Sequence, residues 1–204
     1  MLDQITEWLQ AYQIYMDRQS TVGSLGTIAI ALLALPLLIF VHELGHALAV
    51  RARGLPLKKL KVGDKSDVVL TVGGFRMELG RFTGKGDIGG YVLYDARRST
   101  PADILVVSLA GPAANLLGAV ATGWLARGTG PDFAASLWLL TFWGVWLALA
   151  NLGAHGKEED PTTWSDGRWA RVAWRGIRAG VGAGPPWRDP HESTSVPPPQ
   201  ARPS

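Results

Sequence analysis

Hydrophobic and polar positions divide the chain into three long apolar runs and two polar segments. The first run extends from about residue 22 to 50, and no Lys, Arg, Asp or Glu lies between Arg18 and Glu43. The second runs from about residue 104 to 126 and the third from about 133 to 154, each without a charged residue. Because about 20 apolar residues suffice for a helix to cross the hydrocarbon core, the pattern predicts three transmembrane helices.

The polar segment at about 55–100, between the first and second predicted helices, has the periodicity of strands. Phe75, Met77 and Leu79 alternate with polar or small residues, and residues 68–72 supply a second β-rich run. This pattern predicts a small membrane-associated β-sheet or hairpin. The second and third apolar runs are separated by only a few residues, which predicts an antiparallel helical hairpin.

Both ends of the chain differ from the apolar core at 21–180. Residues 1–20 have apolar positions at helical spacing and predict an amphipathic arm. After Asp166, four arginines recur at helical spacing and predict a basic C-terminal helix, which either lies on anionic lipid or presents a solvated face while it packs on the core. Residues 181–204 are rich in Pro, Gly and Ser and predict a disordered tail. The fold class predicted is a mainly α, polytopic membrane protein.

The charged residues add an orientation to this picture. Of 20 Lys and Arg, eleven lie in residues 51–98 and seven in residues 157–202. Positively charged loops stay in the cytoplasm, so the N-terminus is predicted outside and the C-terminus inside the cell membrane. No nucleic-acid-binding module is recognisable. We therefore interpret the excess of basic residues, which gives a net charge of +3, as a consequence of membrane topology. The oligomeric state cannot be read from the sequence.

The run His42-Glu43-Leu44-Gly45-His46, near the end of the first apolar run, carries the most specific chemistry. Two histidines four residues apart project from one face of a helix and can bind one Zn²⁺. Glu43 lies beside them, where it can take a proton from a metal-bound water. Ionisable residues inside a membrane are costly and usually functional. The motif therefore predicts peptide hydrolysis at or below the membrane surface, near the cytoplasmic face.

A catalytic zinc site needs a third protein ligand. The chain has no Cys, so the third ligand must be His, Asp or Glu. His191 lies in the predicted tail, whereas Asp160 and Asp166 both follow the third apolar run on the predicted side of the His pair. The residue types alone leave these two carboxylates as alternatives.

Four landmarks in order resemble the site-2 proteases, a family of intramembrane zinc metalloproteases, over roughly residues 25–180. The first is the His42–His46 motif. The others are Gly89-Gly90-Tyr91-Val92, then Gly111-Pro112 with Asn115, then Asn151-Leu152 followed by Asp166-Gly167.

The resemblance implies one Zn²⁺ per chain, bound by His42, His46 and Asp166. It implies that Glu43 is the general base and later the proton donor, and that Asn151 and Asn115 position the substrate backbone or the oxyanion. The chain departs from the family pattern where Ala154 replaces a proline and where Asn151 and Asp166 are widely separated, so Asp160 stays an alternative ligand.

The partners expected are a membrane protein with a transmembrane segment, as substrate, and the lipid bilayer. An extended edge of the predicted sheet is expected to pair with an unwound substrate segment, and Met77→Pro is expected to disrupt that edge, abolish cleavage and leave zinc bound. The alternative function is a zinc-binding membrane scaffold without proteolytic turnover, against which the intact Glu43 argues. A soluble zinc peptidase conflicts with three charge-free stretches of more than twenty residues, at 19–42, 104–126 and 133–154.

Overall fold

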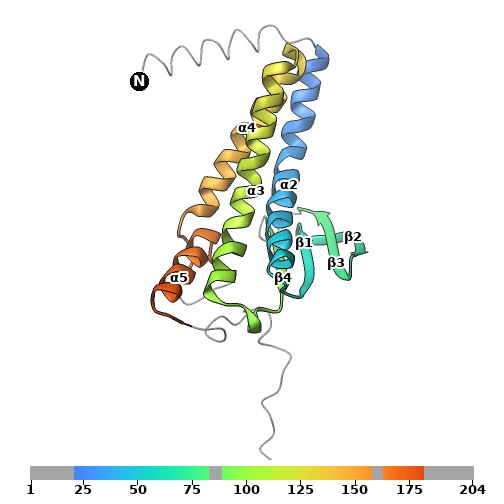
Figure 1. The fold of residues 1–204 in the computed structure, drawn as a ribbon. Helices are drawn as coiled ribbons and strands as arrows, with labels where there is room; N and C mark the ends of the chain where they lie inside the picture. Colours follow the sequence, from blue (N-terminus) through green and yellow to red (C-terminus); the bar gives the residue numbers. More distant parts are fainter. Residues whose placement is uncertain (1–20, 83–88, 158–162, 182–204) are drawn as a thin grey trace, which may run out of the picture.

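The computed structural model describes residues 21–82, 89–157 and 163–181. Three long helices form its bundle: α2 (Thr21–Ala52), α3 (Pro101–Gly128) and α4 (Pro131–Leu152) (Figure 1). All three contain stretches long and apolar enough to cross a membrane, at Leu33–Ala52, Pro101–Gly128 and Phe133–Leu152. The prediction of three candidate spanning helices is confirmed. The predicted N-terminal arm and, apart from Val181, the predicted tail lie outside the described residues.

The helix ends follow from local sequence. Thr100 caps α3 in a reciprocal capping box with Asp103, and Pro101 occupies the first turn, where its missing N–H costs nothing. Pro131 begins α4 in the same way after a short connection from α3. The Asp103 carboxylate also accepts a hydrogen bond of 2.6 Å from Arg53 Nε, just beyond α2. This contact joins the end of α2 to the start of α3.

The segment between α2 and α3 forms a four-stranded mixed sheet with the order β2-β3-β1-β4. The strands are β1 (Leu57–Val62), β2 (Lys65–Val72), β3 (Phe75–Arg81) and β4 (Gly90–Tyr94), followed by a short 3-10 helix, η1 (Ala96–Arg98). β2 and β3 form a hairpin whose two turn residues, Gly73 and Gly74, have φ of 55° and 84°. Such positive values suit glycine and match the twist of a two-residue hairpin.

The expectation that Met77 lies at an extended edge is wrong. Met77 pairs with Leu60 of β1 on one side and with Leu70 of β2 on the other, so β3 is an inner strand. In the described sheet the outer strands are β2 and β4. The chain passes through β2 before β3 returns to pair in parallel with β1. The alternation of apolar residues along one strand does not reveal such a pairing between separate strands.

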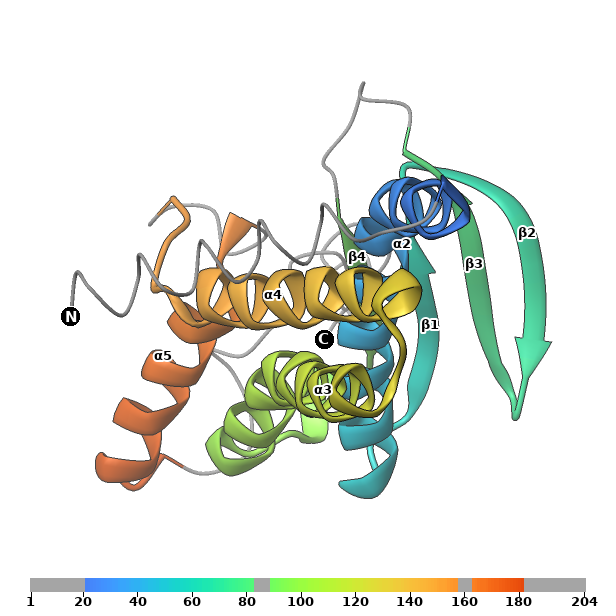
Figure 2. The same ribbon diagram turned by 90° about the horizontal axis from the view of Figure 1, so that it is seen from above.

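The sheet packs against one side of α2 through an apolar cluster. Its buried members are Ile39 and Ala47 of α2, Leu60 and Val62 of β1, and Phe75 of β3. Figure 2 shows the sheet beside α2 and helix α5 (Asp166–Arg178) on the opposite side of the bundle. The bundle and the sheet therefore share one hydrophobic core near the C-terminal half of α2.

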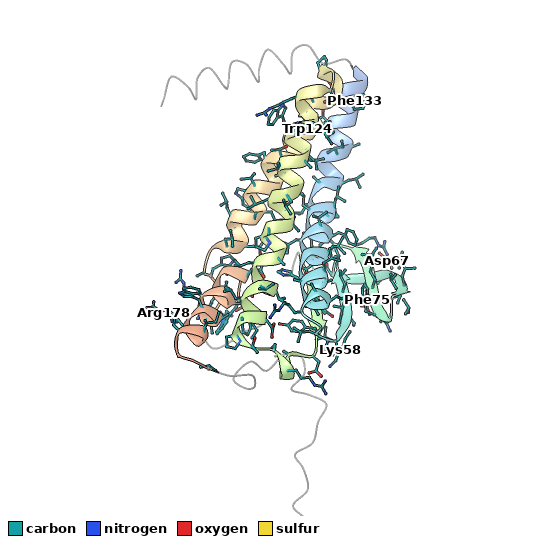
Figure 3. The ribbon with its side chains drawn as sticks, in the orientation of Figure 1. Lys58, Asp67, Phe75, Trp124, Phe133 and Arg178 are labelled. Carbon is teal, nitrogen blue, oxygen red and sulfur yellow. The ribbon has the colours of Figure 1, made fainter. Side chains whose placement is uncertain are left out.

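Helix α5 crosses the end of the bundle opposite the α3–α4 connection (Figures 1 and 2). Its small residues Ala170, Ala173 and Gly176 are buried, and Ala173 packs on Ile104 of α3. The opposite face is exposed and holds Arg171, Trp174, Arg175 and Arg178. The helix thus packs on the core and presents a basic face at the same time. Figure 3 shows Arg178 at this end and Trp124 and Phe133 at the other.

Candidate metal centre

Two imidazoles of α2 face each other inside the bundle. His42 and His46 are 5% and 7% exposed, and their Nε2 atoms lie 3.1 Å apart. Four residues bring the two side chains to one face of the helix, as the sequence predicted. Two nitrogen lone pairs at this distance repel each other unless a proton or a cation lies between them. A proton or a metal cation between the two Nε2 atoms would therefore stabilise this arrangement.

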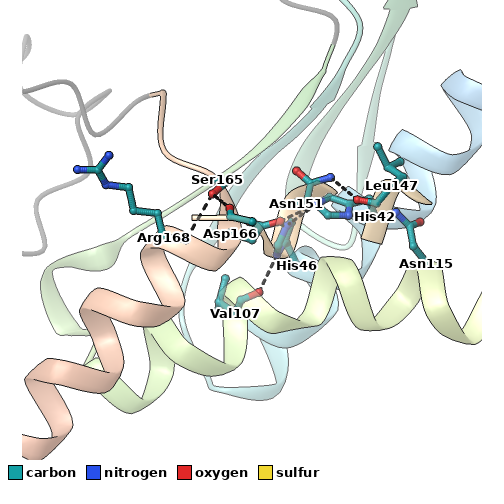
Figure 4. A network of polar contacts seen from close by, with 10 residues as sticks. His42, His46, Val107, Asn115, Leu147, Asn151, Ser165, Asp166 and Arg168 are labelled. Atoms are coloured by element: carbon teal, nitrogen blue, oxygen red, sulfur yellow. Dashed lines mark hydrogen bonds and ion pairs between the residues drawn. The ribbon is translucent and has the colours of Figure 1, made fainter. Parts of the chain in front are cut away.

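The Asp166 carboxylate, from the start of α5, completes the group (Figure 4). Its Oδ2 lies 2.8 Å from Nε2 of His42, and its Oδ1 lies 3.3 Å from Nε2 of His46. Ligands about 2.0–2.2 Å from a tetrahedral zinc ion are separated from one another by roughly 3.3 Å. The separations of 3.1 Å and 3.3 Å are close to that value, and the 2.8 Å contact, made by the other carboxylate oxygen, is shorter. Two imidazoles with one carboxylate form a known catalytic zinc donor set. The residues therefore fit a zinc ion.

The beginning of α5 is held against the end of α4, which directs Asp166 into the bundle. The Ser165 side chain caps α5 by accepting from the Arg168 N–H, and its hydroxyl donates to the carbonyl of Gly153. Gly167 lies so close to the carbonyl of Leu152 that a side chain there would collide with it. Close backbone contact between the two helices is thus what brings the carboxylate to the histidines.

The charge state of Asp166 suits a metal ligand. Burial would raise the pKa of its carboxyl, but the positive charge of His46 and hydrogen bonds from both histidines outweigh burial and hold the pKa at about 2. The carboxylate is therefore ionised at neutral pH, which is the form that binds a cation.

Helix α3 contacts the other ring nitrogen of each histidine. Nδ1 of His46 lies 2.6 Å from the carbonyl oxygen of Val107, to which it donates, and Nδ1 of His42 lies 3.2 Å from Nδ2 of Asn115. Gly111 lies between these two positions. A Cβ atom at Gly111 would overlap Nε2 of His46 and lie 2.7 Å from Nε2 of His42. The histidines therefore fit only because residue 111 has no side chain.

Glu43 is buried beside the histidines, with 6% of its surface exposed. Its side chain lies against the backbone at the start of β4, where a Cβ atom on Gly90 would be 2.6 Å from the Glu43 Cγ. The Gly90 landmark thus has a physical role, because it lets the sheet approach the acidic side chain closely. The polar insert forms one wall of the site.

The remaining predicted site residues have different surroundings. Asn151 is half-buried, and its Nδ2 donates to the carbonyl of Leu147 in its own helix at 3.0 Å (Figure 4). Asn115 is fully buried against His42. Asp160, the alternative third ligand, lies outside the described residues. Among those described, His42, His46 and Asp166 form a group able to hold a metal ion.

Sequence reasoning missed Val107, whose backbone carbonyl contacts His46. A contact through the main chain does not depend on the side chain, so the sequence does not reveal it. Gly90 and Gly111 were noticed as parts of motifs, and the close approaches at both positions explain them.

Three helices long and apolar enough to cross a membrane, with two histidines and a carboxylate that could hold a metal ion, are the features of an integral membrane metalloprotein. The model of peptidase family M50 matches residues 30–167, a range that includes both histidines and Asp166. The chain belongs to this family, the site-2 proteases, and is therefore a membrane metallopeptidase of a zinc-dependent family. A search of curated proteins gives no significant match.

Proposed function

We propose that this protein is an intramembrane zinc metalloprotease that hydrolyses peptide bonds in or near transmembrane segments of other membrane proteins. The observation that carries the proposal is the convergence of His42, His46 and Asp166 within an apolar bundle, beside the buried Glu43. Such a cluster is costly in a membrane unless it has a function.

His42, His46 and Asp166 would hold the zinc ion. A bound zinc ion lowers the pKa of a water ligand to near 7 and polarises a peptide carbonyl. Glu43 would accept the proton of the attacking water and deliver it to the leaving amine. Asn151, half-buried at the end of α4, would position the substrate backbone or the oxyanion through its carboxamide.

The test compares zinc content with cleavage of a model transmembrane substrate. Glu43→Gln keeps the volume of the side chain and all three ligands, so we expect stoichiometric zinc and a loss of activity of about 10²–10⁴-fold. Asp166→Ala should lose both zinc and activity. Wild-type protein without stoichiometric zinc would contradict the proposal. Zinc binding without any cleavage would favour the scaffold alternative.

We also propose that the substrate adds as a strand to β4. β4 is an outer strand of the described sheet, and its first residue, Gly90, lies against Glu43. An extended peptide beside β4 would run past the catalytic carboxylate, and strand addition is a common mode of peptide recognition. N-methylation of alternate residues near the scissile bond of a peptide substrate should block cleavage. Equal tolerance at every position would contradict strand addition.

For topology, we propose that the N-terminus is outside and that the metal centre faces the cytoplasm. The end of the bundle that carries α5 and the sheet is rich in Lys and Arg, and the exposed arginines and Trp174 of α5 suit anionic headgroups. Because the chain has no Cys, single-cysteine variants give clean labelling. An impermeant thiol reagent should label Arg127→Cys in intact cells and Arg178→Cys only after permeabilisation. The reverse pattern would invert the topology.

A further inference from the structure

One face of α3 carries three residues against the histidine pair: Val107, Gly111 and Asn115. They are spaced by four and lie on one stripe of the helix. Val107 offers a carbonyl to His46, Gly111 leaves room for both rings, and Asn115 reaches His42. The pattern matches the general rule that a metal-binding histidine is held through its other ring nitrogen.

The side chain of Asn115 has an unusual environment. It is 0% exposed, its Nδ2 lies 3.2 Å from Nδ1 of His42, and its buried Oδ1 has no hydrogen-bond partner among the described residues. A buried amide oxygen without a donor is unfavourable, so it calls for an explanation. The two terminal atoms of the amide exchange places by a half-turn that leaves the side-chain shape unchanged.

Metal binding would give that oxygen a hydrogen-bond donor. A neutral imidazole that binds a metal through Nε2 carries its hydrogen on Nδ1, so Nδ1 of His42 becomes a donor. A donor needs an acceptor, and Oδ1 is the atom of Asn115 that can accept. In the zinc-bound protein the amide would therefore turn Oδ1 toward His42.

We propose that Asn115 is a positioning residue that accepts a hydrogen bond from Nδ1 of His42 and aims its Nε2 at the metal. The Val107 carbonyl does the same for His46, so α3 orients both histidines of α2. This inference rests on the proposed zinc site. It assigns Asn115 to the metal and leaves substrate contacts to other residues, because a fully buried side chain behind His42 presents no surface to a substrate.

The test measures zinc affinity by chelator competition, and the visible spectrum of the cobalt-loaded protein, in three variants. Asn115→Leu keeps the volume without a hydrogen bond, and Asn115→Asp keeps only oxygen acceptors. Thr122→Val is the matched control, because Thr122 lies on α3 and pairs with Thr141 of α4 at 2.8 Å. We expect Asn115→Leu to lose about 10–100-fold in affinity and to alter the cobalt spectrum, Asn115→Asp to stay within a few-fold of wild type, and Thr122→Val to be unchanged.

Two results would overturn the inference: wild-type affinity and spectrum in Asn115→Leu, or a loss in Asn115→Asp as large as in Asn115→Leu. If Asn115→Leu does not fold, Asn115→Asp decides alone, because it replaces only the amide nitrogen and keeps the shape. Wild-type protein that binds no zinc overturns the inference and the proposed function together. Wild-type protein that binds zinc and cleaves nothing affects only the proposed proteolysis.

Discussion

The bundle contains polar side chains at two levels, and they differ in how their hydrogen bonds are satisfied. Toward the α3–α4 connection, two hydroxyl pairs link helices: Thr27 with Ser136 at 3.0 Å and Thr122 with Thr141 at 2.8 Å. The three threonine hydroxyls also lie within hydrogen-bond distance of carbonyls of their own helices. Each hydroxyl therefore has its partners in place, and nothing further needs to bind.

At the other level, ring nitrogens of His42 and His46 and the carboxylate of Asp166 converge from α2 and α5. Each of these residues offers an atom that can bind a cation. Polarity inside an apolar bundle therefore does not by itself indicate a functional site, because hydroxyl pairs commonly join helices. The metal centre differs from the two hydroxyl pairs because several atoms that can bind a cation converge there from separate elements.

Among changes that leave all three metal ligands in place, the largest expected effect comes from filling the space beside the histidines. Gly111→Ala should lower zinc affinity by about 100-fold and abolish cleavage, because the new Cβ would overlap a ring nitrogen of His46. Chelator competition measures the loss.

Gly118→Ala is the matched control on the same helix, because nothing lies within 4 Å of its Cβ position. Helix propensity favours Ala over Gly at both positions by up to about 1 kcal/mol. If Gly111→Ala binds zinc as well as Gly118→Ala does, the close packing described at the centre is contradicted.

A smaller effect is expected where the sheet meets the site. A Cβ at Gly90 would press on the Glu43 side chain and on the backbone carbonyl of Lys61, so it would shift β4 relative to Glu43. Gly90→Ala should therefore lower cleavage by roughly 100-fold while zinc stays bound. Activity and zinc content of one preparation give both values. Gly89→Ala, with open space around its Cβ position, should behave like wild type. Equal activities of the two variants would contradict the idea that the packing of β4 against Glu43 affects cleavage.

The smallest effect belongs to the hydroxyl level. Thr122→Val removes one interhelical hydrogen bond and should cost about 0.6 kcal/mol of stability, with zinc affinity and turnover unchanged. Thermal unfolding in detergent measures the stability. A loss of zinc in this variant would show that the two levels are coupled, contrary to their separate hydrogen-bond networks.

Local patterns explain which parts of this protein could be predicted. The apolar runs predicted all three spanning helices, and the alternation around Phe75 predicted the β2–β3 pairing. The four-residue spacing of His42 and His46 predicted one shared face. The inner position of Met77 could not be foreseen, because a parallel pairing depends on how distant strands meet.

By itself, the sequence determined the membrane class, the lengths of the helices and the histidine pair, because hydrophobic length and helical repeat act over neighbouring residues. Only the tertiary structure decided that the Asp166 carboxylate reaches the histidines, and that Asn115 and Val107 lie behind them. Those contacts join residues 61 to 124 positions apart. They depend on the room that Gly111 leaves for both rings and on the close approach of α4 and α5 at Gly167, which residue order alone does not specify.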